Sequence, residues 1–478
     1  MTTKMEEKLP KELIRMALIL VLGAVAPMLD TTMVNIAVNQ FAYDFHSSLD
    51  TIQWVITGYV LATAIAVPFS GWLINRFDGK HIYLAAELLF LISSILSGIS
   101  WSIESLIAFR LIQGFSAGLI IPLLTTLLVK AAGQENMGKL MSIVGLPIIL
   151  GPILGPVIGG GIVEYFSWRW IFFVNIPFGV IALYFIYKKL PSFPAANKQA
   201  KLDGFGIIVL GALSVSYIYG ITQAASGSGF GNAKAIAFII IGVILTVVYV
   251  IYAFSKPKKV VVPLNLFKYR SFSASIISLV LAGIGTNGAM LLLPLFFQNI
   301  RNDSVVLTGL SLIPQGLGML VARPVIGKMI DKFGAKIVVM IAIVITLIGT
   351  IPFLWFTQNT NYGVMAVVLF IRGMGVGGIT IPIMTDSYTG LSKNQIPQAS
   401  IATRIIQNIG GAFGSALLAT IVAQQMNHLE PSLSNLTSAY HAAFLVSSAL
   451  TLVMFIPSLF LTNKVTRKAK ILTINNKS

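Results

Sequence analysis

The sequence predicts an all-α polytopic membrane protein with 14 membrane-crossing helices. Of its 478 residues, 56% are hydrophobic and only 10% are charged, whereas a soluble domain carries about 25% charged residues. Fourteen apolar runs are each long enough to cross a hydrocarbon core of about 30 Å. Lysine and arginine gather between alternate runs, which is typical of cytoplasmic loops. Length, apolarity and this alternation of charge therefore agree on one fold class.

The expected spans follow one another along nearly the whole chain. In order, they cover residues 14–37, 51–74, 82–101, 105–129, 139–162, 169–189, 204–224, 235–255, 273–297, 306–329, 337–357, 362–386, 396–424 and 438–462. Each has about 20 residues or more, the length that a helix needs to cross a bilayer. A count of twelve is the alternative if the seventh and eighth runs are re-entrant.

The positions of the basic residues set the orientation. With both termini in the cytoplasm, only Arg169, Lys234 and Arg301 fall at the outer side. Four arginines lie within spans: Arg110, Arg323, Arg372 and Arg404. The other lysines and arginines then lie in the cytoplasmic segments. The net charge of +17 is thus explained by topology and by contact with anionic lipids, and we expect no nucleic-acid binding.

Several chemistries are excluded or disfavoured. The chain has no cysteine and only four histidines, which are scattered, so no metal site is expected. "GQENMGKL" (133–140) nearly spells a phosphate-binding loop, and "GMGVGG" (373–378) has dinucleotide-binding spacing. Neither has the strand–loop–helix context that those motifs require. We therefore expect no cofactor and, without a nucleophile–base set, no enzyme.

The chain contains a parallel internal repeat. "GWLINRFDGKHIY" closes the second expected span, and "GKMIDKFGAKIVV" closes the tenth. "RLIQGFSAGLIIP" in the fourth span has a looser counterpart, "RGMGVGGITIP", in the twelfth. Such internal repeats indicate two related halves. We expect an N-terminal six-helix bundle over residues 1–190, a linker with two extra helices over 191–272, a second six-helix bundle over 273–463 and a cytoplasmic tail over 464–478.

These strings resemble the major facilitator superfamily, in particular its 14-helix drug:proton antiporter (DHA2-type) branch, over nearly the whole chain. "GPILGPVIGG" followed by "SWRWIFFVNIPFGV" is similar to the antiporter motif of helix five and to the branch's Trp-Arg-Trp signature. "LDTTMVNIAV", "QWVITGYVLATA" and "LLLPLFFQ" with "GLSLIP" also match the branch. The resemblance implies a major facilitator fold and proton-driven export of lipophilic compounds by alternating access.

The fifth span carries a stripe of small residues. Gly151, Gly155 and Gly159 recur every four residues and share one helix face, which lets another helix approach closely. Pro152 and Pro156 remove backbone donors and can bend the helix. The residues predict a bent packing face. The resemblance implies that this face makes a tight contact between the two halves.

The resemblance also implies a conformational gate in the cytoplasmic turns after the second and tenth spans. Its expected residues are Gly71, Asn75, Arg76, Asp78, Gly327, Asp331, Lys332 and Gly334. The first turn departs from the family pattern, because Asn75 stands where aspartate is usual and Asp78 where glycine is usual. Either the latch of the first half is weaker or Asp78 substitutes. A merely solvated, positively charged turn is the remaining alternative.

Asp30 is a carboxylate inside an apolar run, where a charge is costly. With a rise of 1.5 Å per residue, Asp30 and Arg110 fall at similar depths in the membrane. The resemblance places both helices at a central cavity, so we expect this pair to share an aqueous pocket and to couple transport to protons. Burial favours the neutral carboxyl and the arginine favours the charged one. A static brace and a different partner for Asp30 are the alternatives.

Lipophilic substrates need apolar walls with few fixed polar groups. The candidate liners of the substrate cavity are Met28, Asp30, Met33, Asn35, Tyr59, Thr63, Asn287, Phe297, Gln298 and Gln315. Asn287 is close to the repeat position of Asp30, so the second half offers a neutral amide there. Packing or lipid contact is the alternative for each neutral residue. Glu87, near the cytoplasmic end of the third span, is expected to reach the interface or a neighbouring helix instead of carrying a proton.

Together these features predict a proton-coupled antiporter that exports lipophilic, monocationic or neutral drugs across the cytoplasmic membrane. Its expected partners are protons, lipophilic small molecules and a lipid bilayer, and the chain is expected to act as a monomer. An exporter of one metabolite, peptide or lipid is an alternative that the sequence leaves open. A non-transporting membrane receptor or scaffold is a second alternative, which the repeated gate turns and embedded charges disfavour.

Overall fold

The computed structural model describes most of the chain. The described residues are 10–47, 49–132, 151, 154–155, 157–195, 198, 201–225, 231–256, 260–392, 395–427 and 432–463. Within these ranges the regular structure is helical and contains no strand. The prediction of an all-α protein is therefore confirmed. The expected span 139–162 lies largely outside the described residues.

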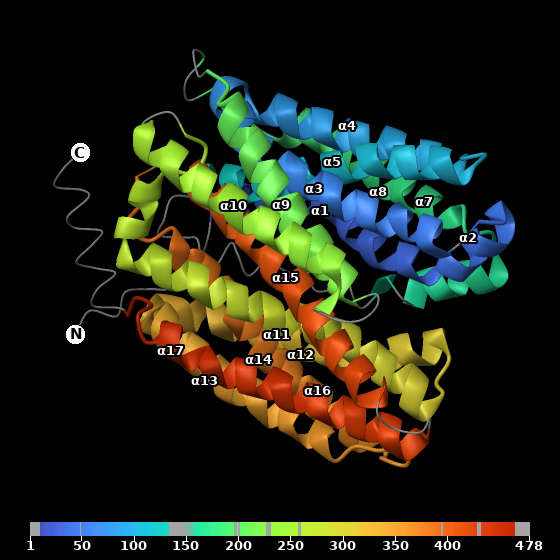
Figure 1. The fold of residues 1–478 in the computed structure, drawn as a ribbon. Coiled ribbons are helices and arrows are strands. Elements are labelled where there is room, and N and C mark those ends of the chain that lie inside the picture. Colours follow the sequence, from blue (N-terminus) through green and yellow to red (C-terminus); the bar gives the residue numbers. More distant parts are fainter. Residues whose placement is uncertain are drawn as a thin grey trace.

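The N-terminal helices form the upper part of Figure 1, in blue to teal. They are α1 (Lys11–Met33), α2 (Val38–Phe45), α3 (Leu49–Arg76), α4 (Gly79–Gly98), α5 (Ile103–Ala132), α7 (Trp170–Phe173) and α8 (Asn175–Lys189). Long apolar runs give the four longest of these helices, and a cap starts α4, where the Asp78 side chain accepts from the backbone N–H groups of Lys80 and His81. Helix α1 packs against α5 and α8, and α3 packs against α5.

Two further helices stand beside this group. They are α9 (Gly204–Ala225) and α10 (Ala233–Ser255), which pack against each other. Asp203, just before α9, accepts a hydrogen bond from the Tyr252 hydroxyl at 2.5 Å and one from the Val261 backbone N–H at 3.1 Å. The seventh and eighth expected spans are thus each one continuous helix of more than 20 residues. Re-entrant loops at these positions are therefore disfavoured.

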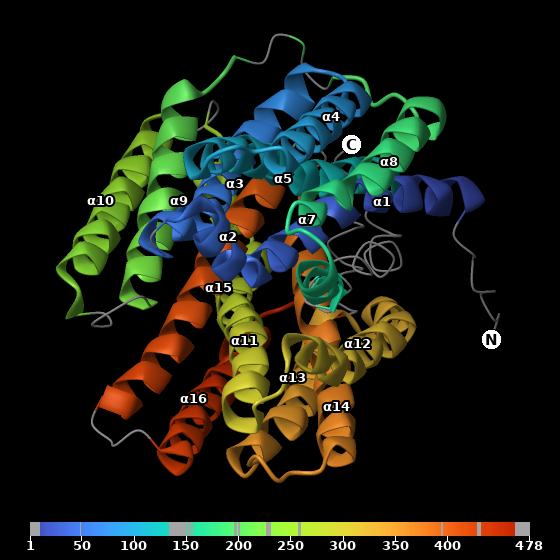
Figure 2. The same cartoon turned by 90° about the vertical axis from the view of Figure 1, so that its right-hand side faces the viewer.

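The C-terminal helices form the lower part of Figures 1 and 2, in yellow to red. They are α11 (Arg270–Arg301), α12 (Val305–Phe333), α13 (Ala335–Thr350), α14 (Tyr362–Ser387), α15 (Ile396–Asn427), α16 (Leu433–Val453) and α17 (Phe455–Ser458). Helix α11 packs along α15, and α12 and α13 pack against α14. Helix α9 contacts both α3 and α15, so it touches both groups.

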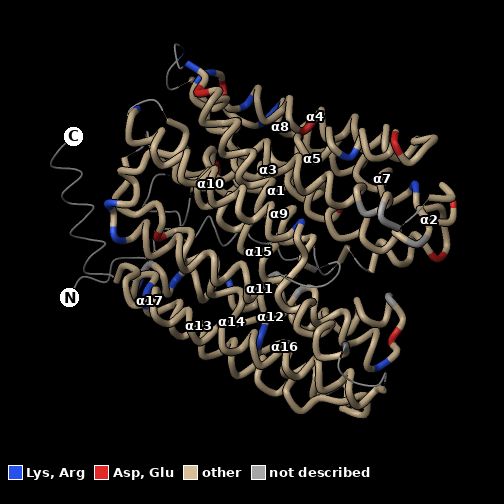
Figure 3. The backbone as a smooth tube through the Cα atoms, viewed as in Figure 1, with Lys and Arg blue, Asp and Glu red and all other residues tan. Residues whose placement is uncertain are grey.

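Twelve helices among the described residues are long and apolar enough to cross a membrane. Each coincides with one of the fourteen expected spans. The expected span 273–297 lies within α11, which has 32 residues. Lysine and arginine are concentrated at one end of the molecule, on the left in Figure 3. The chain is thus a multi-pass membrane protein.

The internal repeat predicted from sequence has a matching geometry. A Cβ atom built on Gly114 of α5 would lie 2.3 Å from the Tyr59 carbonyl oxygen of α3. One built on Gly373 of α14 would lie 2.0 Å from the Gln315 carbonyl oxygen of α12. Both distances are too short for any side chain, so the two helix pairs cross at backbone contact. Tyr59 and Gln315 hold equivalent places in the two pairs.

Candidate functional site

Asp30 lies inside the N-terminal group of helices and is fully buried. Its Oδ2 atom forms an ion pair with the Arg110 guanidinium. Its Oδ1 atom accepts hydrogen bonds from the Gln113 side-chain amide at 3.2 Å and from the Asn175 amide at 3.3 Å. Helices α1, α5 and α8 thus converge on one carboxylate.

Arg110 is itself held on several sides. Its Nε atom donates to the Val55 carbonyl oxygen at 3.2 Å, and its Nη1 atom donates to the Gln113 side-chain oxygen at 2.7 Å. The Tyr59 ring lies 4.0 Å from the guanidinium carbon, a cation–π contact. Residues of both α3 and α5 therefore hold the positively charged Arg110 side chain in place opposite Asp30.

Sequence reasoning missed the residues around this pair. Gln113 and Asn175 bind Asp30, and the Asn175 amide also donates to the Ser94 hydroxyl at 2.9 Å. Ser94 in turn donates to the Phe172 carbonyl oxygen at 3.0 Å. Gln113 lies one helical turn after Arg110, and Asn175 lies within the string "SWRWIFFVNIPFGV". A polar residue in an apolar run is the signal that could have identified both.

The corresponding arginine of the second half is held by neutral groups. Arg372 of α14 is buried, and its Nη1 atom donates to the Gln315 side-chain oxygen at 2.8 Å. Its Nε atom donates to the Thr350 hydroxyl at 3.2 Å. Among the described residues no carboxylate contacts Arg372 in an ion pair. The side chain of Asn287 lies outside the described part of the structure.

The remaining predicted cavity residues are distributed more widely. Tyr59 and Gln315 are buried beside the two arginines, and the Thr63 hydroxyl donates to the Gly114 carbonyl oxygen at 3.0 Å. Phe297 is fully buried in an aromatic cluster of the second half. Of the others, Met33 is buried, Met28 and Gln298 are half-buried, and Asn35 is exposed. The structure thus brings Tyr59 to Asp30 and Arg110 and leaves Phe297 in packing.

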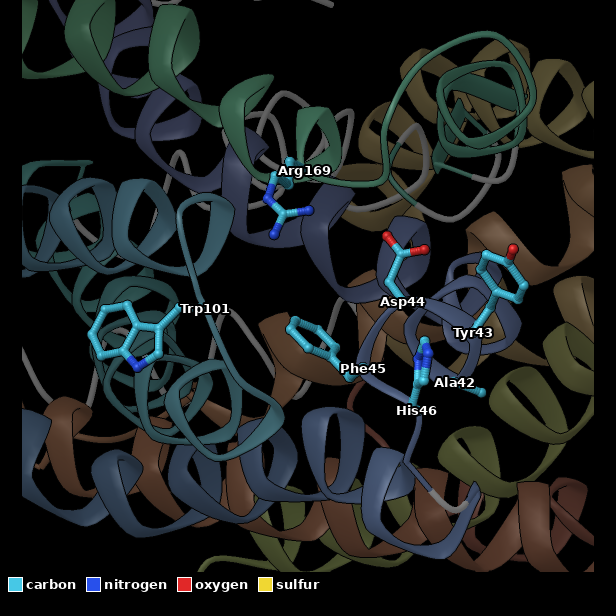
Figure 4. Close-up of a pocket in the computed structure, with 7 residues that line it drawn as sticks. All are labelled: Ala42, Tyr43, Asp44, Phe45, His46, Trp101 and Arg169. Atoms are coloured by element: carbon cyan, nitrogen blue, oxygen red, sulfur yellow. The ribbon is translucent and has the colours of Figure 1, made fainter.

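Figure 4 shows a pocket at one end of the N-terminal helices, with a volume of about 720 Å³. Its lining residues are Ala42, Tyr43, Asp44, Phe45, His46, Trp101 and Arg169. Asp44 accepts a hydrogen bond from the Trp168 indole N–H at 2.7 Å. A second pocket, of about 450 Å³, lies at the first gate turn. No residue predicted to line the substrate cavity lines either pocket.

The glycine stripe of the fifth span packs on α1, the helix that carries Asp30. A Cβ atom on Gly155 would lie 1.9 Å from the Thr32 hydroxyl oxygen, and one on Gly159 would lie 3.2 Å from Met33. Thr32 also donates to the Gly151 carbonyl oxygen at 3.1 Å. These contacts join helices of the same half. Contact with the second half comes instead from Val157, which lies against Gly309. Pro152 and Pro156 are outside the described residues.

The first gate turn is organised around Asp78. Besides capping α4, its carboxylate accepts a hydrogen bond from the Ser192 hydroxyl. The Arg76 guanidinium donates to the Lys198 carbonyl oxygen at 2.8 Å, and Asn75 is half-buried. Partial burial acts to raise the pKa of Asp78, but the Ser192 and backbone hydrogen bonds hold it below its ordinary value. Asp78 is therefore more than a solvated charge.

The two gate turns meet other parts of the chain in related ways. The Gly79 backbone N–H donates to the Phe193 carbonyl oxygen at 2.9 Å, and the Lys336 N–H donates to the Thr462 carbonyl oxygen at 3.0 Å. In each half, the chain leaving the last helix returns to the gate turn. Gly334 has φ +84° and lies against the Asn463 backbone, so glycine is needed there.

The other gate residues differ in their surroundings. Gly71 lies against the Ile401 side chain of α15, across the two halves. Gly327 is buried, and Lys332 is exposed near the Phe333 ring. The Asp331 side chain lies outside the described part of the structure. Among the described gate residues, Gly71 makes a close contact that joins the two halves.

Comparison with known proteins identifies the family to which this architecture belongs. Residues 20–415 match the model of the Major Facilitator Superfamily. The Multidrug resistance protein B homolog of Mycobacterium tuberculosis (strain ATCC 25618 / H37Rv) is 29% identical over 95% of this chain and 91% of its own length. The Multidrug export protein EmrB of Haemophilus influenzae is 30% identical over 85% of this chain and 79% of its own.

A solved structure shows the same fold. The human organic anion transporter MFSD10 matches with a TM-score of 0.62 and 15% sequence identity, covering 94% of this chain and all of its own. At that identity the likeness concerns the fold alone. The predicted major facilitator fold is confirmed, as is the resemblance on which it rested. The chain belongs to the Major Facilitator Superfamily and is a multi-pass membrane transporter.

Proposed function

We propose that this transporter is a proton-coupled antiporter that exports lipophilic, monocationic or neutral compounds across the cytoplasmic membrane. The observation that carries the proposal is the buried Asp30–Arg110 pair. A charge at this depth is costly and marks function more often than packing. The names of the two relatives, which refer to multidrug resistance and multidrug export, agree with the substrate class.

The pair supplies a means of exchange. In the described conformation Asp30 is balanced by Arg110 and by amide donors from Gln113 and Asn175. A proton on Asp30 removes its charge and weakens all of these contacts. A cationic substrate needs the charged carboxylate, so proton and substrate compete for one residue. Alternating access then turns this competition into exchange across the membrane.

Neutral compounds fit the same scheme through Tyr59 and the apolar surfaces around it. The Tyr59 ring already lies on the Arg110 guanidinium, so a substrate that displaces it would alter how the arginine faces Asp30. On the second half, Arg372 is met by neutral Gln315 and Thr350. Asn287, a neutral amide, stands close to the repeat position of Asp30. A single acidic site supports monocations in preference to dications.

The proposed topology follows from the distribution of charge. We place both termini in the cytoplasm, because the lysine- and arginine-rich end in Figure 3 then meets the anionic inner leaflet. The two groups of helices act as the moving bundles, with boundaries at 1–190 and 273–463 and the two extra helices between them. Each chain holds one Asp30 site, and we propose that it works as a monomer.

Uphill transport in proteoliposomes tests the proposal. Vesicles with an imposed proton gradient are supplied with ethidium as a cationic probe, and wild type is compared with Asp30→Asn. We expect wild type to concentrate ethidium against its gradient and Asp30→Asn to equilibrate it at most. The matched control is Asp44→Asn, an exposed aspartate of the same half, which should behave as wild type.

Two results would overturn the proposal. Normal uphill transport by Asp30→Asn would remove Asp30 as the coupling residue and leave it as a brace. Failure of wild type to move ethidium or a neutral lipophilic dye, together with transport of one metabolite, peptide or lipid, would favour the narrow-specificity exporter.

A further inference from the structure

Glu87 is a second acidic residue buried within the membrane-spanning part of the chain. It lies in α4, and none of its surface is exposed. Neither of its carboxyl oxygens has a hydrogen-bond partner among the described residues. Glu87 lies against Gly23 of α1, which agrees with the predicted contact with a neighbouring helix. The same prediction held that Glu87 carries no proton, and the surroundings of the carboxyl argue against that part.

The surroundings of Glu87 are almost entirely apolar. A Cβ atom on Gly23 of α1 would lie 3.2 Å from Glu87 Oε2, so the carboxyl sits directly on the α1 backbone. The nearby Tyr83 hydroxyl donates instead to the Leu20 carbonyl oxygen at 2.6 Å. Phe90, one turn further along α4, is buried in the same apolar cluster as Tyr83. Nothing described in this environment compensates a negative charge.

Charged groups on the helices around α4 are engaged elsewhere or lie apart from Glu87. Arg110 pairs with Asp30, Arg76 donates to Lys198, and Lys130 of α5 donates to the Ile74 carbonyl oxygen at 3.5 Å. The others described on these helices are Lys11, Glu12 and Arg15 of α1, Glu104 of α5, and Lys188 and Lys189 of α8, none of which forms an ion pair with Glu87 in the described structure. The Asp50 side chain of α3 lies outside the described part of the structure.

An unpaired carboxylate in such surroundings is strongly disfavoured. Moving a charge from water into an apolar medium without a partner costs far more than moving the neutral acid. A membrane-embedded carboxyl avoids this cost by keeping its proton. The geometry thus requires the neutral acid at Glu87, in contrast to Asp30, which contacts Arg110 and two amide donors.

The two carboxyls flank the same helix contact. Gly23 and Asp30 are seven residues apart on α1 and share one face, and Glu87 and Ser94 are seven apart on α4. Ser94 is joined to Asp30 through the Asn175 amide. Seven residues correspond to about 10 Å along a helix. Glu87 therefore lies about two turns from the level of Asp30, toward the end where α4 begins.

We propose that Glu87 is a second proton-binding residue of this transporter, carrying a proton in the described conformation and releasing it when water reaches the α1–α4 contact. The released proton passes from the carboxyl oxygen to water and leaves a carboxylate. This inference rests on the proposed antiport function, which it deepens by adding one proton to each transport cycle beyond the one exchanged at Asp30.

Infrared difference spectroscopy of the purified full-length protein at neutral pH tests the protonation state without transport. Subtracting the Glu87→Gln spectrum from that of wild type should reveal a protonated-carboxyl band that shifts in D2O. Glu164→Gln, at an exposed glutamate, is the matched control and should reveal a carboxylate band. A carboxylate band lost in Glu87→Gln would overturn the proposal. If Glu87→Gln does not accumulate, Glu87→Met gives the same subtraction with an apolar side chain of similar length.

The proton-to-substrate ratio tests the role in the cycle. It is obtained from the ethidium gradient that cancels net ethidium flux in proteoliposomes at a fixed proton gradient, with the membrane potential clamped at zero. We expect Glu87→Gln to transport with one proton fewer per ethidium than wild type. An unchanged ratio would overturn the role of Glu87 while leaving the antiport proposal intact. Flux in wild type that ignores the proton gradient would instead overturn the antiport proposal, and the infrared band would still report on Glu87.

Discussion

Asp30 of α1 and Arg110 of α5 form an ion pair that is sealed from solvent, with side-chain exposures of 0% and 2%. Two further helices contribute to the seal, α3 through Tyr59 and α8 through Asn175. A pair of this kind is costly to build and costly to break. Removing the guanidinium and removing the carboxylate have different expected consequences, so substitutions of Arg110 and Asp30 test the pair.

Removing only the arginine should be strongly destabilising. Arg110→Ala leaves Asp30 as a buried carboxylate with amide donors alone, and we expect a loss of about 3–5 kcal/mol in the free energy of unfolding. The double variant Asp30→Asn with Arg110→Ala should recover much of this loss, because no buried charge remains. Thermal unfolding in detergent measures both. Equal stabilities of the single and double variants would show that the carboxylate does not depend on the arginine.

Asn175 should tune the proton affinity of Asp30 without carrying a proton. Asn175→Leu removes one donor to the carboxylate, so the neutral acid becomes relatively more favourable. We expect the pH profile of transport to move to higher pH. Ser93→Ala is the control, because Ser93 donates only within its own helix. An unmoved profile would mean that Asn175 only packs.

The backbone contact between α3 and α5 should be intolerant of any side chain. Gly114→Ala places a Cβ atom against the Tyr59 carbonyl, and we expect a cost of about 1–3 kcal/mol from overpacking. Gly373→Ala should cost a similar amount at the equivalent crossing. Gly161→Ala is the matched control, since no neighbouring atom of the described residues lies within 4 Å of the added Cβ. Similar unfolding temperatures for Gly114→Ala and Gly161→Ala would contradict the close crossing.

The first gate turn should be sensitive to acid. The pKa of Asp78 is below its ordinary value in the folded protein, so the unfolded state takes up a proton first as the pH falls. The stabilisation is therefore present at neutral pH and declines below about pH 4. Thermal unfolding from neutral pH down to about pH 2 should show this decline in wild type. Ser192→Ala should reduce it and Asp78→Asn should remove the part due to this group. The same acid dependence in all three proteins would place the effect elsewhere.

Much of the architecture could be predicted because a bilayer permits few solutions. Thirteen expected spans coincide with described helices, since apolar runs of about 20 residues have little choice but to be helical in lipid. The depths of Asp30 and Arg110 followed from helix rise alone. The positions of Gln113 and Asn175 around them did not, because rotation of a helix about its axis is set by packing that the apolar pattern leaves open.

The partner of the glycine stripe and the burial of Glu87 also depend on packing between helices, which the sequence of one helix does not reveal. The glycine stripe of the fifth span was expected at the contact between halves but packs on α1 at Thr32 and Met33. Small residues indicate a close helix contact without naming the partner. Glu87 lies only a few turns from a helix end in sequence, yet the absence of a Cβ at Gly23 opens a place for it inside. Its burial depends on two helices at once, which periodicity in one of them does not reveal.

The competition of proton and substrate for Asp30 is tested most directly by counting protons when substrate binds. Purified protein in weakly buffered detergent solution, near the pH at which transport is half-maximal, is mixed with ethidium while a pH indicator is followed. Wild type should release protons in proportion to ethidium bound, and Asp30→Asn should release none from this residue while Asp44→Asn behaves as wild type. Equal proton release by wild type and Asp30→Asn would contradict Asp30 as the shared site.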